Sequence, residues 1–445
     1  MQLTIQRSSA LHGEITLPGD KSISHRAALF AALAQGESRI ENFLVSGVTG
    51  AMLRSLTALG VHWGLDGTTL SVAGRGVEGL VPPEGALDCG NSATTMRMLA
   101  GALAAAGTAA VLDGTPSLRR RPMDRIITPL QAMGVPIQAG PQGTAPLALQ
   151  ARPVGQALRA LYYELPVASA QVKTCLLLAA LAAGDPTTLV EPSLSRDHTE
   201  RMLASMGVAL RSGQVDGRPS VTLSPAEAID LAPLRMTIPG DFSAAAFLIV
   251  AALVAPGSEV VLRGVGLNPT RTGLLASLWE MGAEIKVENE RVYAGETLGD
   301  LRVRAGSLQG VSVSGGRVVD MIDEFPAFAV AAAFARGRTE VSQAEELRFK
   351  ESDRIGSLCA ELRKLGVQVE EHRDGFVIEG TGEVPGGAQV DPNGDHRLAM
   401  ALAVAGLGAE NPVTVLEAGI MSESFPEFTT AMGQLGAGLE VEGGQ

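Results

Sequence analysis

The chain has 445 residues, of which 46% are hydrophobic but only 4% aromatic, so its core must be built from aliphatic side chains. Its formal net charge of −13 argues against a nucleic-acid partner, which would prefer a basic surface. The longest apolar run, residues 244–255, is too short to cross a membrane, which needs roughly 20 residues, and no secretory signal is visible. The cysteines, Cys89, Cys175 and Cys359, are odd in number and lack metal-ligand spacing. These features predict a cytoplasmic protein without a metal centre.

The first predicted helix starts after Asp20 and continues into the apolar residues 27–33. Asp20 is of a type preferred at helix N-caps, and the Pro-Gly pair before it ends an extended segment. Lys21, Ser22 and Arg26 lie in the first two turns, where unpaired backbone N–H groups and the helix dipole favour anions. Such a helix start is suited to binding a phosphate or a carboxylate. The alternative is an ordinary capped helix with a solvated lysine and arginine.

One pattern recurs six times along the chain: a helix with Leu or Met four and one residues before a glycine. The intervals between these glycines are 74, 73, 75, 84 and 70 residues. The glycine is interpreted as a left-handed residue that ends the helix, and the apolar pair as its buried stripe. The six glycines are Gly60, Gly134, Gly207, Gly282, Gly366 and Gly436.

A second pattern alternates with the first and consists of helices that are apolar on all sides, with their polar residues confined to the first turns. Helices of this kind belong in the middle of a domain. Each repeat therefore supplies one buried helix with a polar N-terminus and one amphipathic surface helix, joined by strands. The predicted starting positions of the buried helices are Asp20, Asn91, Ser169, Asp241, Glu324 and Asp395.

The repeats are expected to form two lobes of three, because the tetrapeptide at residues 17–20 is echoed at residues 238–241. These two sites are interpreted as chain crossings that could serve as a hinge. The first lobe comprises residues 19–238, and the second comprises residues 1–18 plus 239–445. A solenoid is the alternative, but a period of about 74 residues exceeds the 20–45 residues usual for solenoids. An α+β fold with two compact lobes is therefore predicted.

The ionisable residues near the helix starts differ between the lobes. The first lobe carries basic residues, whereas the second combines basic residues with acids. A carboxylate such as Asp323, next to an apolar helix, needs a partner or a task. Glu351 and Arg354 are three residues apart, so an ordinary helix ion pair is the simple interpretation. The basic residues of the first lobe are Lys21, Arg26, Arg121, Lys173 and Arg196.

The sequence lacks the usual nucleotide and nucleophile motifs. It has neither a phosphate-binding loop of the Gly-x-x-x-x-Gly-Lys type nor a Gly-x-Gly-x-x-Gly fingerprint, and Gly-x-Ser-x-Gly is also absent. His25 and His396 stand at helix starts without companions at metal-ligand spacing. The chemistry implied is electrostatic: arginines and lysines hold two anionic ligands, and carboxylates move protons.

Motifs spread over essentially the whole chain resemble those of the EPSP synthase (3-phosphoshikimate 1-carboxyvinyltransferase) family, and several are similar to its glyphosate-tolerant, class II-like subgroup. The resemblance implies an inside-out α/β barrel fold, or α-β prism, in two domains, each with three repeats around buried central helices. It also implies a place in the shikimate pathway of aromatic amino acid biosynthesis. The motifs are Gly19-Asp20-Lys21-Ser22-Ile23-Ser24-His25-Arg26, Gly90-Asn91-Ser92-Ala93-Thr94, Arg121-Pro122-Met123, Ser169-Ala170-Gln171-Val172-Lys173, Arg196-Asp197-His198-Thr199-Glu200, Asn268-Pro269-Thr270-Arg271, Lys350-Glu351-Ser352-Asp353-Arg354 and Asp395-His396-Arg397.

Carried over motif by motif, the resemblance implies two small-molecule substrates and no cofactor. Asp323 would be the base at the substrate's 5-hydroxyl, Glu351 would transfer a proton at the methylene carbon, and Lys21 would stabilise charge or assist as an acid. Shikimate 3-phosphate would contact Lys21, Ser22, Arg26, Ser169, Ala170, Gln171, Arg196, Asp323 and Lys350. Phosphoenolpyruvate would contact Lys21, Ala93, Arg121, Gln171, Arg354 and Arg397.

Two positions depart from the pattern of many family members. Ala93 replaces a glycine beside the phosphoenolpyruvate site, and Glu423 replaces a lysine before Ser424. The added methyl group should crowd the longer inhibitor glyphosate more than the substrate, so reduced glyphosate sensitivity is expected. The missing lysine leaves the ligand contacts around Glu423 open.

Two other functions remain as alternatives. A UDP-N-acetylglucosamine 1-carboxyvinyltransferase would have Asn at Ser22 and a cysteine a few residues before Arg121, whereas the nearest upstream cysteine is Cys89. A non-catalytic protein that binds phosphorylated metabolites would have no reason to place Asp323 and Glu351 among arginines. The protein is expected to be a monomer whose lobes are drawn together by anionic substrate.

Overall fold

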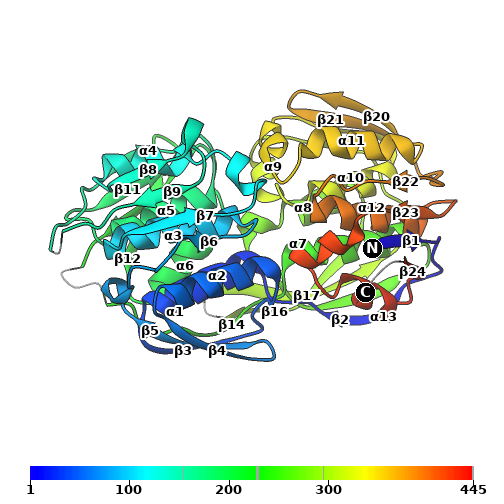
Figure 1. The fold of residues 1–445 in the computed structure, drawn as a ribbon. Coiled ribbons are helices and arrows are strands. Elements are labelled where there is room, and N and C mark those ends of the chain that lie inside the picture. Colours follow the sequence, from blue (N-terminus) through cyan, green and yellow to red (C-terminus); the bar gives the residue numbers. More distant parts are fainter. Residues whose placement is uncertain (154, 227–229, 294, 443–445) are drawn as a thin grey trace. The chain divides into compact units, whose positions relative to one another are not determined.

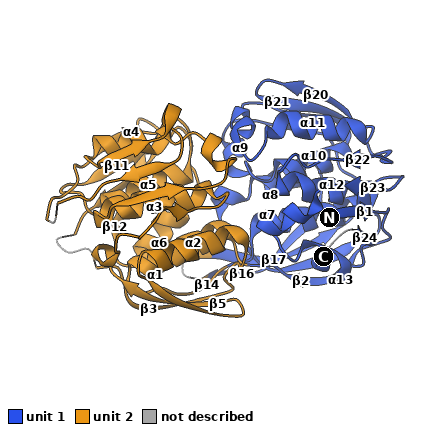
Figure 2. Ribbon diagram, viewed as in Figure 1, with its two compact units in different colours: residues 1–18, 239–292, 297–445 blue, residues 19–238, 293–296 orange. Residues whose placement is uncertain are grey.

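The computed structural model divides into two compact units, each with its own apolar core (Figure 2). The described residues are 1–153, 155–226, 230–293 and 295–442. Unit 1 consists of residues 1–18, 239–292 and 297–445, and unit 2 of residues 19–238 and 293–296. Among the described residues, no helix is both long and apolar enough to cross a bilayer.

Helices that are buried along almost their whole length run through the core of each unit (Figure 1). Every residue of α7 and of α10 is buried, which is possible because these helices consist almost entirely of apolar residues. In unit 2 the buried helices are α1 (Lys21–Leu33), α3 (Ala93–Ala106) and α5 (Ala170–Ala180). In unit 1 they are α7 (Phe242–Val254), α10 (Phe325–Ala333) and α12 (His396–Gly408).

The predicted starts of these helices agree with the structure except at α3. Asp20 and Ser169 cap α1 and α5 with their side chains, as expected for such residues. The cap of α3 is Ser92 instead of Asn91, and its side chain accepts a hydrogen bond from the Thr95 amide. The Asn91 side chain instead accepts a hydrogen bond from the Thr115 hydroxyl, so the serine takes the capping position.

The predicted amphipathic helices are all present, and each ends two residues before the expected glycine. The six glycines have φ between +82° and +95°, which confirms their role in ending the helices. The helices are α2 (Gly47–Ala58), α4 (Asp124–Ala132), α6 (His198–Ser205), α8 (Gly273–Glu280), α11 (Arg354–Lys364) and α13 (Phe428–Gln434).

Within the described residues the strands form six four-stranded sheets that share one topology. In each sheet a parallel pair lies at one end, and the next strand is antiparallel to the inner strand of that pair. Unit 2 contains β14 (Arg235–Thr237)–β3 (Gln35–Glu41)–β5 (Thr69–Arg75)–β4 (His62–Asp66), β6 (Leu87–Asp88)–β7 (Ala110–Asp113)–β9 (Leu147–Leu149)–β8 (Ile137–Ala139) and β10 (Tyr162–Glu164)–β11 (Thr187–Val190)–β13 (Arg218–Ser224)–β12 (Ala209–Val215). Unit 1 contains β2 (His12–Thr16)–β15 (Glu259–Gly266)–β17 (Glu296–Arg304)–β16 (Glu284–Tyr293), β18 (Ser312–Val313)–β19 (Arg336–Val341)–β21 (Gly375–Thr381)–β20 (Gln368–His372) and β22 (Gln389–Val390)–β23 (Val413–Val415)–β1 (Gln2–Ile5)–β24 (Leu439–Glu442).

The parallel pairs determine where the polar helix starts lie. In the repeats of α3, α5, α10 and α12, the buried helix connects the two parallel strands, so its N-terminus follows the end of the first strand. Short helical segments lie in the connections that carry several candidate residues. They are α9 (Gly316–Asp320) and the 3-10 turns η1 (Val77–Gly79), η2 (Leu118–Arg120), η3 (Pro141–Gly143), η4 (Pro269–Arg271), η5 (Glu345–Phe349) and η6 (Ala418–Glu423).

Candidate active site

In unit 2, the starts of α1 and α3 are joined through a buried histidine. His25 Nδ1 lies 2.8 Å from the Lys21 carbonyl oxygen, and its Nε2 lies 3.4 Å from the Ser92 hydroxyl. Burial lowers the pKa of His25 to about 4, and the charges of Lys21 and Arg26 add to this effect. His25 is therefore neutral at physiological pH and holds the two helix starts together by hydrogen bonds.

Arg26 joins α1 to α5 and α6 through buried hydrogen bonds. It is 2% exposed, and its Nε donates to the Thr199 hydroxyl at 2.7 Å. Its Nη2 donates to the Thr174 hydroxyl at 2.8 Å, and its Nη1 donates to the Ser22 carbonyl oxygen at 2.9 Å. Burial lowers the pKa of Arg26 to about 10, so the side chain keeps its charge at neutral pH. The structure thus places Arg26, a predicted substrate-binding residue, in contact with the backbone of Ser22.

The start of α5 is joined to α3 through Gln171. Its Oε1 accepts a hydrogen bond from Arg97 at 2.6 Å, and its Nε2 donates to the Thr94 hydroxyl at 2.9 Å. Arg97 also donates to the Pro122 carbonyl oxygen at 2.9 Å. Pro122 directly follows Arg121, which is predicted to bind phosphoenolpyruvate. Sequence reasoning missed Arg97, because an arginine inside an apolar helix carries no motif of its own.

A buried ionic network supports Arg196. Arg196 Nη1 donates to the Ser22 hydroxyl at 3.4 Å. The preceding residue, Ser195, donates its hydroxyl to Glu191, and its carbonyl oxygen accepts from Lys173 at 3.2 Å. The network therefore fixes the turn that carries Arg196.

The structure shows what compensates the charge of Lys173, which the sequence groups with the basic residues near the helix starts of the first lobe. Its ammonium group is buried and pairs with Glu191 at 2.8 Å and with Glu200 at 2.7 Å. Burial lowers the pKa of Lys173, but the charges of Glu200 and Glu191 outweigh this effect and raise it above the ordinary value. Lys173 is a structural ion-pair residue, because one lysine is shared by two carboxylates.

The remaining candidates of unit 2 lie at the same helix starts. Lys21 and Ala170 are the first residues of α1 and α5, and Ser169 caps α5. Ala93 is the first residue of α3 and is 4% exposed. Unit 2 therefore brings together Lys21, Ser22, Arg26, Ala93, Arg121, Ser169, Ala170, Gln171 and Arg196 on the starts of α1, α3 and α5 and on the adjoining turns.

In unit 1, one buried guanidinium collects three carboxylates. Arg354 Nε lies 2.7 Å from Asp395, Nη2 lies 2.6 Å from Glu351, and Nη1 lies 3.3 Å from Asp323. Burial lowers the pKa of Arg354, but the charges of Asp395, Glu351 and Asp323 outweigh this effect and keep it above the ordinary value. The Glu351–Arg354 pair exists, as its spacing suggested, but it belongs to a larger cluster.

A second arginine approaches the same cluster from the start of α12. Arg397 Nη1 donates to the Asp323 carbonyl oxygen at 3.2 Å, and its Nη2 lies 3.8 Å from the Asp323 carboxylate. Asp395 caps α12 by accepting from the amides of Arg397 and Leu398. Burial raises the pKa of Asp395, but the Arg354 charge outweighs this effect and holds it below its usual value.

Glu324, which follows Asp323 in the sequence, belongs to a buried polar network. Glu324 is fully buried and accepts a hydrogen bond from the Ser243 hydroxyl at the start of α7. Arg271 donates to the same hydroxyl at 2.8 Å and lies 3.6 Å from both Glu324 and Asp241. These contacts fix the start of α10 and with it the turn that carries Asp323.

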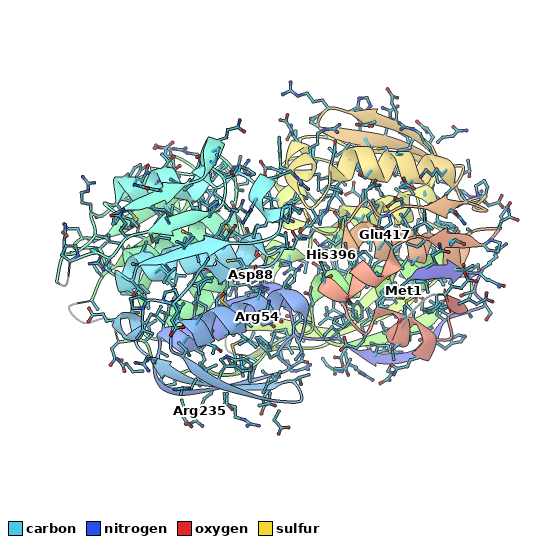
Figure 3. All side chains as sticks on the ribbon, in the orientation of Figure 1. Met1, Arg54, Asp88, Arg235, His396 and Glu417 are labelled. Atoms are coloured by element: carbon cyan, nitrogen blue, oxygen red, sulfur yellow. The ribbon has the colours of Figure 1, made fainter. Side chains whose placement is uncertain are left out.

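Lys350 and Glu423 lie at the ends of two 3-10 turns in unit 1, η5 and η6. Lys350 directly follows η5 and is half-buried, and it precedes Glu351. Glu423, at the end of η6, lies 3.6 Å from His396 Nδ1. His396 is the first residue of α12 and is labelled in Figure 3. Unit 1 therefore brings together Asp323, Lys350, Glu351, Arg354 and Arg397 on one set of helix starts and turns.

Each unit thus has a polar end suited to electrostatic chemistry. Donors and positive charges dominate the polar end in unit 2, whereas unit 1 combines arginines with two partly exposed carboxylates. The cysteines offer no nucleophile, because burial raises the pKa of Cys89 and of Cys359 to about 12 and also raises that of Cys175. In the described part of the chain, no group of three or more His, Cys, Asp or Glu side chains could hold a metal ion.

Comparison with known proteins places the chain in one family. The family model "EPSP synthase (3-phosphoshikimate 1-carboxyvinyltransferase)" matches residues 5–432. A 3-phosphoshikimate 1-carboxyvinyltransferase of Salinibacter ruber is 47% identical over 96% of this chain and 98% of its own length. The enzyme of that name from Xanthomonas euvesicatoria is 48% identical over 98% of this chain and 97% of its own length.

Solved structures agree in fold. EPSP synthase from Acinetobacter baumannii matches with a TM-score of 0.87 and 39% identity, covering 99% of this chain and 100% of that one. The enolpyruvyl transferase NikO from Streptomyces tendae matches with a TM-score of 0.78 over 99% of this chain and 98% of its own, but at 19% identity this likeness concerns the fold alone. The α/β fold in two domains predicted from the sequence is therefore confirmed. The chain belongs to the EPSP synthase (3-phosphoshikimate 1-carboxyvinyltransferase) family.

Proposed function

We propose that the chain is an enzyme that transfers the 1-carboxyvinyl group of phosphoenolpyruvate to the 5-hydroxyl of shikimate 3-phosphate. The products are 5-enolpyruvylshikimate 3-phosphate and inorganic phosphate. Curated relatives that are 44–48% identical over nearly the full length carry this activity in their names. This supports an enzyme of the shikimate pathway.

The observation that carries the proposal is the cluster around Arg354. A protein that merely binds two anions gains nothing from carboxylates at its binding groups, because they repel the ligands. Here Asp323 and Glu351 are held by Arg354 at 3.3 Å and 2.6 Å, yet their side chains remain 18% and 20% exposed. Oriented carboxylates that a substrate can reach are what proton transfer requires.

Shikimate 3-phosphate is assigned mainly to donors of unit 2. Its phosphate and carboxylate match hydroxyl and cationic donors at helix starts, where backbone N–H groups add to the attraction. Asp323 and Lys350 of unit 1 would complete the set. The proposed contacts are Lys21, Ser22, Arg26, Ser169, Ala170, Gln171, Arg196, Asp323 and Lys350.

Phosphoenolpyruvate carries a phosphate and a carboxylate of its own and is assigned to the arginines. Guanidinium groups suit both anions, because their planar N–H pairs match two oxygens at once. The proposed contacts are Lys21, Ala93, Arg121, Gln171, Arg354 and Arg397. With the phosphates neutralised by these side chains, the reaction needs no cofactor.

The proposed chemistry has two stages. In the first, Asp323 accepts the proton of the 5-hydroxyl as the oxygen attacks C2 of phosphoenolpyruvate, and Glu351 supplies a proton to the methylene carbon. In the second, the tetrahedral intermediate loses a proton from the resulting methyl group to Glu351 as the C2–O bond to phosphate breaks, and the proton held by Asp323 passes to the released phosphate, which resets both carboxyl groups. Lys21 stabilises the negative charge or protonates the leaving phosphate.

Phosphate release in the presence of both substrates tests the function. We expect release from shikimate 3-phosphate plus phosphoenolpyruvate, none from either alone, and none when UDP-N-acetylglucosamine replaces the first substrate. Asp323→Ala should lower the rate by about a hundredfold or more. Asp66→Ala, at an exposed position of β4, is the matched control and should leave the rate unchanged. Release with the nucleotide sugar, or an active Asp323→Ala enzyme, would contradict the assignment.

We also propose that the enzyme is less sensitive to glyphosate than family members with glycine at position 93. Ala93 is the first residue of α3, and only 4% of the residue is exposed. An extra methyl group in a tight anion pocket penalises a longer ligand more than a shorter one. The sequence motifs of the tolerant subgroup support the same expectation.

The variant Ala93→Gly tests this expectation directly. The glyphosate concentration that halves the rate should fall by about tenfold, because a steric difference of this kind corresponds to roughly 1.4 kcal/mol. The KM for phosphoenolpyruvate should change by less than about threefold. Equal inhibition of the two enzymes would show that the methyl group has no such role.

Two further properties are part of the proposal. We infer a cytoplasmic location, which is supported by three cysteines that are buried and form no disulfide. We also expect a monomer, and analytical ultracentrifugation of the purified chain should give the 46.0 kDa mass.

A further inference from the structure

The amide group of Gln171 is held at both ends, which fixes its orientation. The guanidinium of Arg97 is a donor and can meet only an acceptor, so the atom 2.6 Å from it must be the carbonyl Oε1. The opposite end, Nε2, donates one hydrogen to the Thr94 hydroxyl at 2.9 Å. The second hydrogen of Nε2 therefore remains the group that Gln171 can offer to a ligand.

The crossing of α3 and α5 makes this arrangement rigid. A Cβ atom on Gly101 of α3 would lie 2.8 Å from the Cα of Cys175 on α5 and closer still to its carbonyl oxygen. The two helix backbones are thus in direct contact at this point. Arg97 and Gln171 lie four residues, or one turn, before these two positions, on the same side of the crossing. The close contact holds the guanidinium within reach of the amide.

The same guanidinium also holds the loop that carries Arg121. Its Nη1 binds Gln171, while its Nη2 donates to the Pro122 carbonyl oxygen at 2.9 Å. Arg97 and Thr94 are three residues apart and therefore share a face of α3. One helix face consequently orients two residues, Gln171 and Arg121, that lie on different segments of unit 2.

We propose that Arg97 is a positioning residue that turns the N–H side of Gln171 toward phosphoenolpyruvate and sets the backbone of the Arg121 loop. This inference rests on the proposed function. With Arg97 in place, the ligand meets a donor at Gln171. If the amide turned over, its carbonyl oxygen would face an anion and repel it. The role is one of orientation, because Arg97 donates to Gln171 and to the Pro122 carbonyl oxygen, which are both protein groups.

Paired variants at Thr94 and Arg97 test the orientation. Thr94→Val removes the acceptor for Nε2 and should raise the KM for phosphoenolpyruvate about fivefold, whereas Thr94→Ser keeps the hydroxyl and should stay within about twofold of the wild type. Arg97→Met should raise this KM about thirtyfold, since hydrogen bonds from a charged donor are lost, and Arg97→Lys should recover part of the effect. The kcat should fall less than the KM rises.

Gln171→Glu separates polarity from packing. The glutamate has the same shape and keeps an acceptor for Arg97, so the melting temperature should be maintained. It lacks the N–H donor, so the KM for phosphoenolpyruvate should rise at least tenfold. In a Gln171→Ala background, Arg97→Met should have less than a third of its effect in the wild type, because the two residues act together.

Arg54→Met is the matched control for the loss of an arginine. Arg54 is exposed on α2 of the same unit (Figure 3), and its replacement should leave both KM and melting temperature unchanged. If Arg97→Met raises the KM no more than Arg54→Met does, the proposal is wrong. The same conclusion follows if Thr94→Val and Thr94→Ser behave alike.

A readout without turnover keeps the inference separate from the proposed function. In ¹⁵N-labelled, ligand-free protein, the side-chain amide signals of Gln171 can be identified by their absence in Gln171→Glu. Thr94→Val and Arg97→Met should move these signals, whereas Thr94→Ser and Arg54→Met should not. Signals that stay unmoved in Arg97→Met would overturn the positioning role. If the wild-type enzyme released no phosphate, the proposed function would fail, while these spectra would still decide the arrangement of the amide.

Discussion

Exposure distinguishes the three carboxylates around Arg354. The Asp395 side chain is fully buried, caps α12 and has a pKa held below its usual value by the arginine, so it serves the structure. Asp323 and Glu351 pair with the same guanidinium but keep 18% and 20% of their side-chain surface exposed. The shared arginine therefore orients two carboxylates that a substrate can reach. The third carboxylate helps to compensate its charge inside the protein.

The buried histidine of α1 predicts a specific dependence of stability on pH. Burial lowers the pKa of His25 from 6.5 to about 4 in the folded protein. Between these values the unfolded chain binds more protons at this residue than the folded one does, so the free energy of unfolding decreases as the pH falls. The loss between pH 6.5 and 4 should reach about 3 kcal/mol.

Unfolding experiments at several pH values can check this prediction. His25→Gln removes the titrating group, so its unfolding free energy should lack this part of the decline between pH 6.5 and 4. The exposed His62 on β4 provides the control, and His62→Gln should follow the wild type. If the His25→Gln curve also runs parallel to the wild type, the buried histidine does not cause the dependence.

At the scale of single residues, the contacts of the candidate side chains could be predicted from the sequence only in part. Asp323 was expected to need a partner, and the partners are Arg354 and Arg397. Lys173 was grouped with the other basic residues near the helix starts, and its partners are two glutamates of the protein. Positive charge alone does not reveal whether a ligand or a buried carboxylate compensates it. Arg97 was missed for a related reason, because its function depends on neighbours from α5 and from the Arg121 loop.

At the scale of helices, most of the repeat could be predicted from local signals. Glycines such as Gly60 and Gly436 end helices because their φ of +82° and +93° is strained for other residues. N-caps were predicted from the type of residue. Residue type alone cannot identify the cap where two suitable residues are adjacent. At α3 the choice between Asn91 and Ser92 depends on the Thr115 hydroxyl, which no local pattern reveals.

The contact between α3 and α5 predicts the effect of a small substitution. In Gly101→Ala the new methyl group would overlap the backbone of Cys175, which cannot move away as a flexible side chain could. We expect the free energy of unfolding to fall by about 3 kcal/mol, at the upper end of the usual cost of overpacking. The KM for phosphoenolpyruvate should rise as well, because the Arg97–Gln171 contact lies one turn away.

Gly47→Ala is the matched control at this scale. Gly47 is the first residue of α2, and a Cβ atom there would have nothing within 4 Å. The substitution should leave stability unchanged or raise it by about 0.5 kcal/mol, since alanine restricts the unfolded chain. Thermal denaturation of both variants measures the difference. Similar melting temperatures for the two would mean that the helices can separate without cost.

At the scale of the whole chain, the number of repeats was readable from the sequence, but the pairing of strands was not. β2 pairs with β15 and β14 pairs with β3, although the partners lie about 200 residues or more apart in the sequence. Short strands carry little register information, and such distant pairs leave no local pattern. The function was predicted from the motifs as a set, because each motif alone also fits an ordinary capped helix or surface ion pair.

The proposed function depends on one reaction, in which two anionic substrates are joined and phosphate is released. The most direct measurement uses phosphoenolpyruvate labelled with ¹³C at C2, shikimate 3-phosphate and the purified chain, followed by ¹³C NMR. We predict that the labelled carbon becomes part of an enol ether bonded to the 5-oxygen of shikimate 3-phosphate, with one phosphate released per transfer. Asp323→Ala should slow this conversion by about a hundredfold or more. Label that remains in phosphoenolpyruvate, or that appears as pyruvate without an enol ether, would contradict the proposed function.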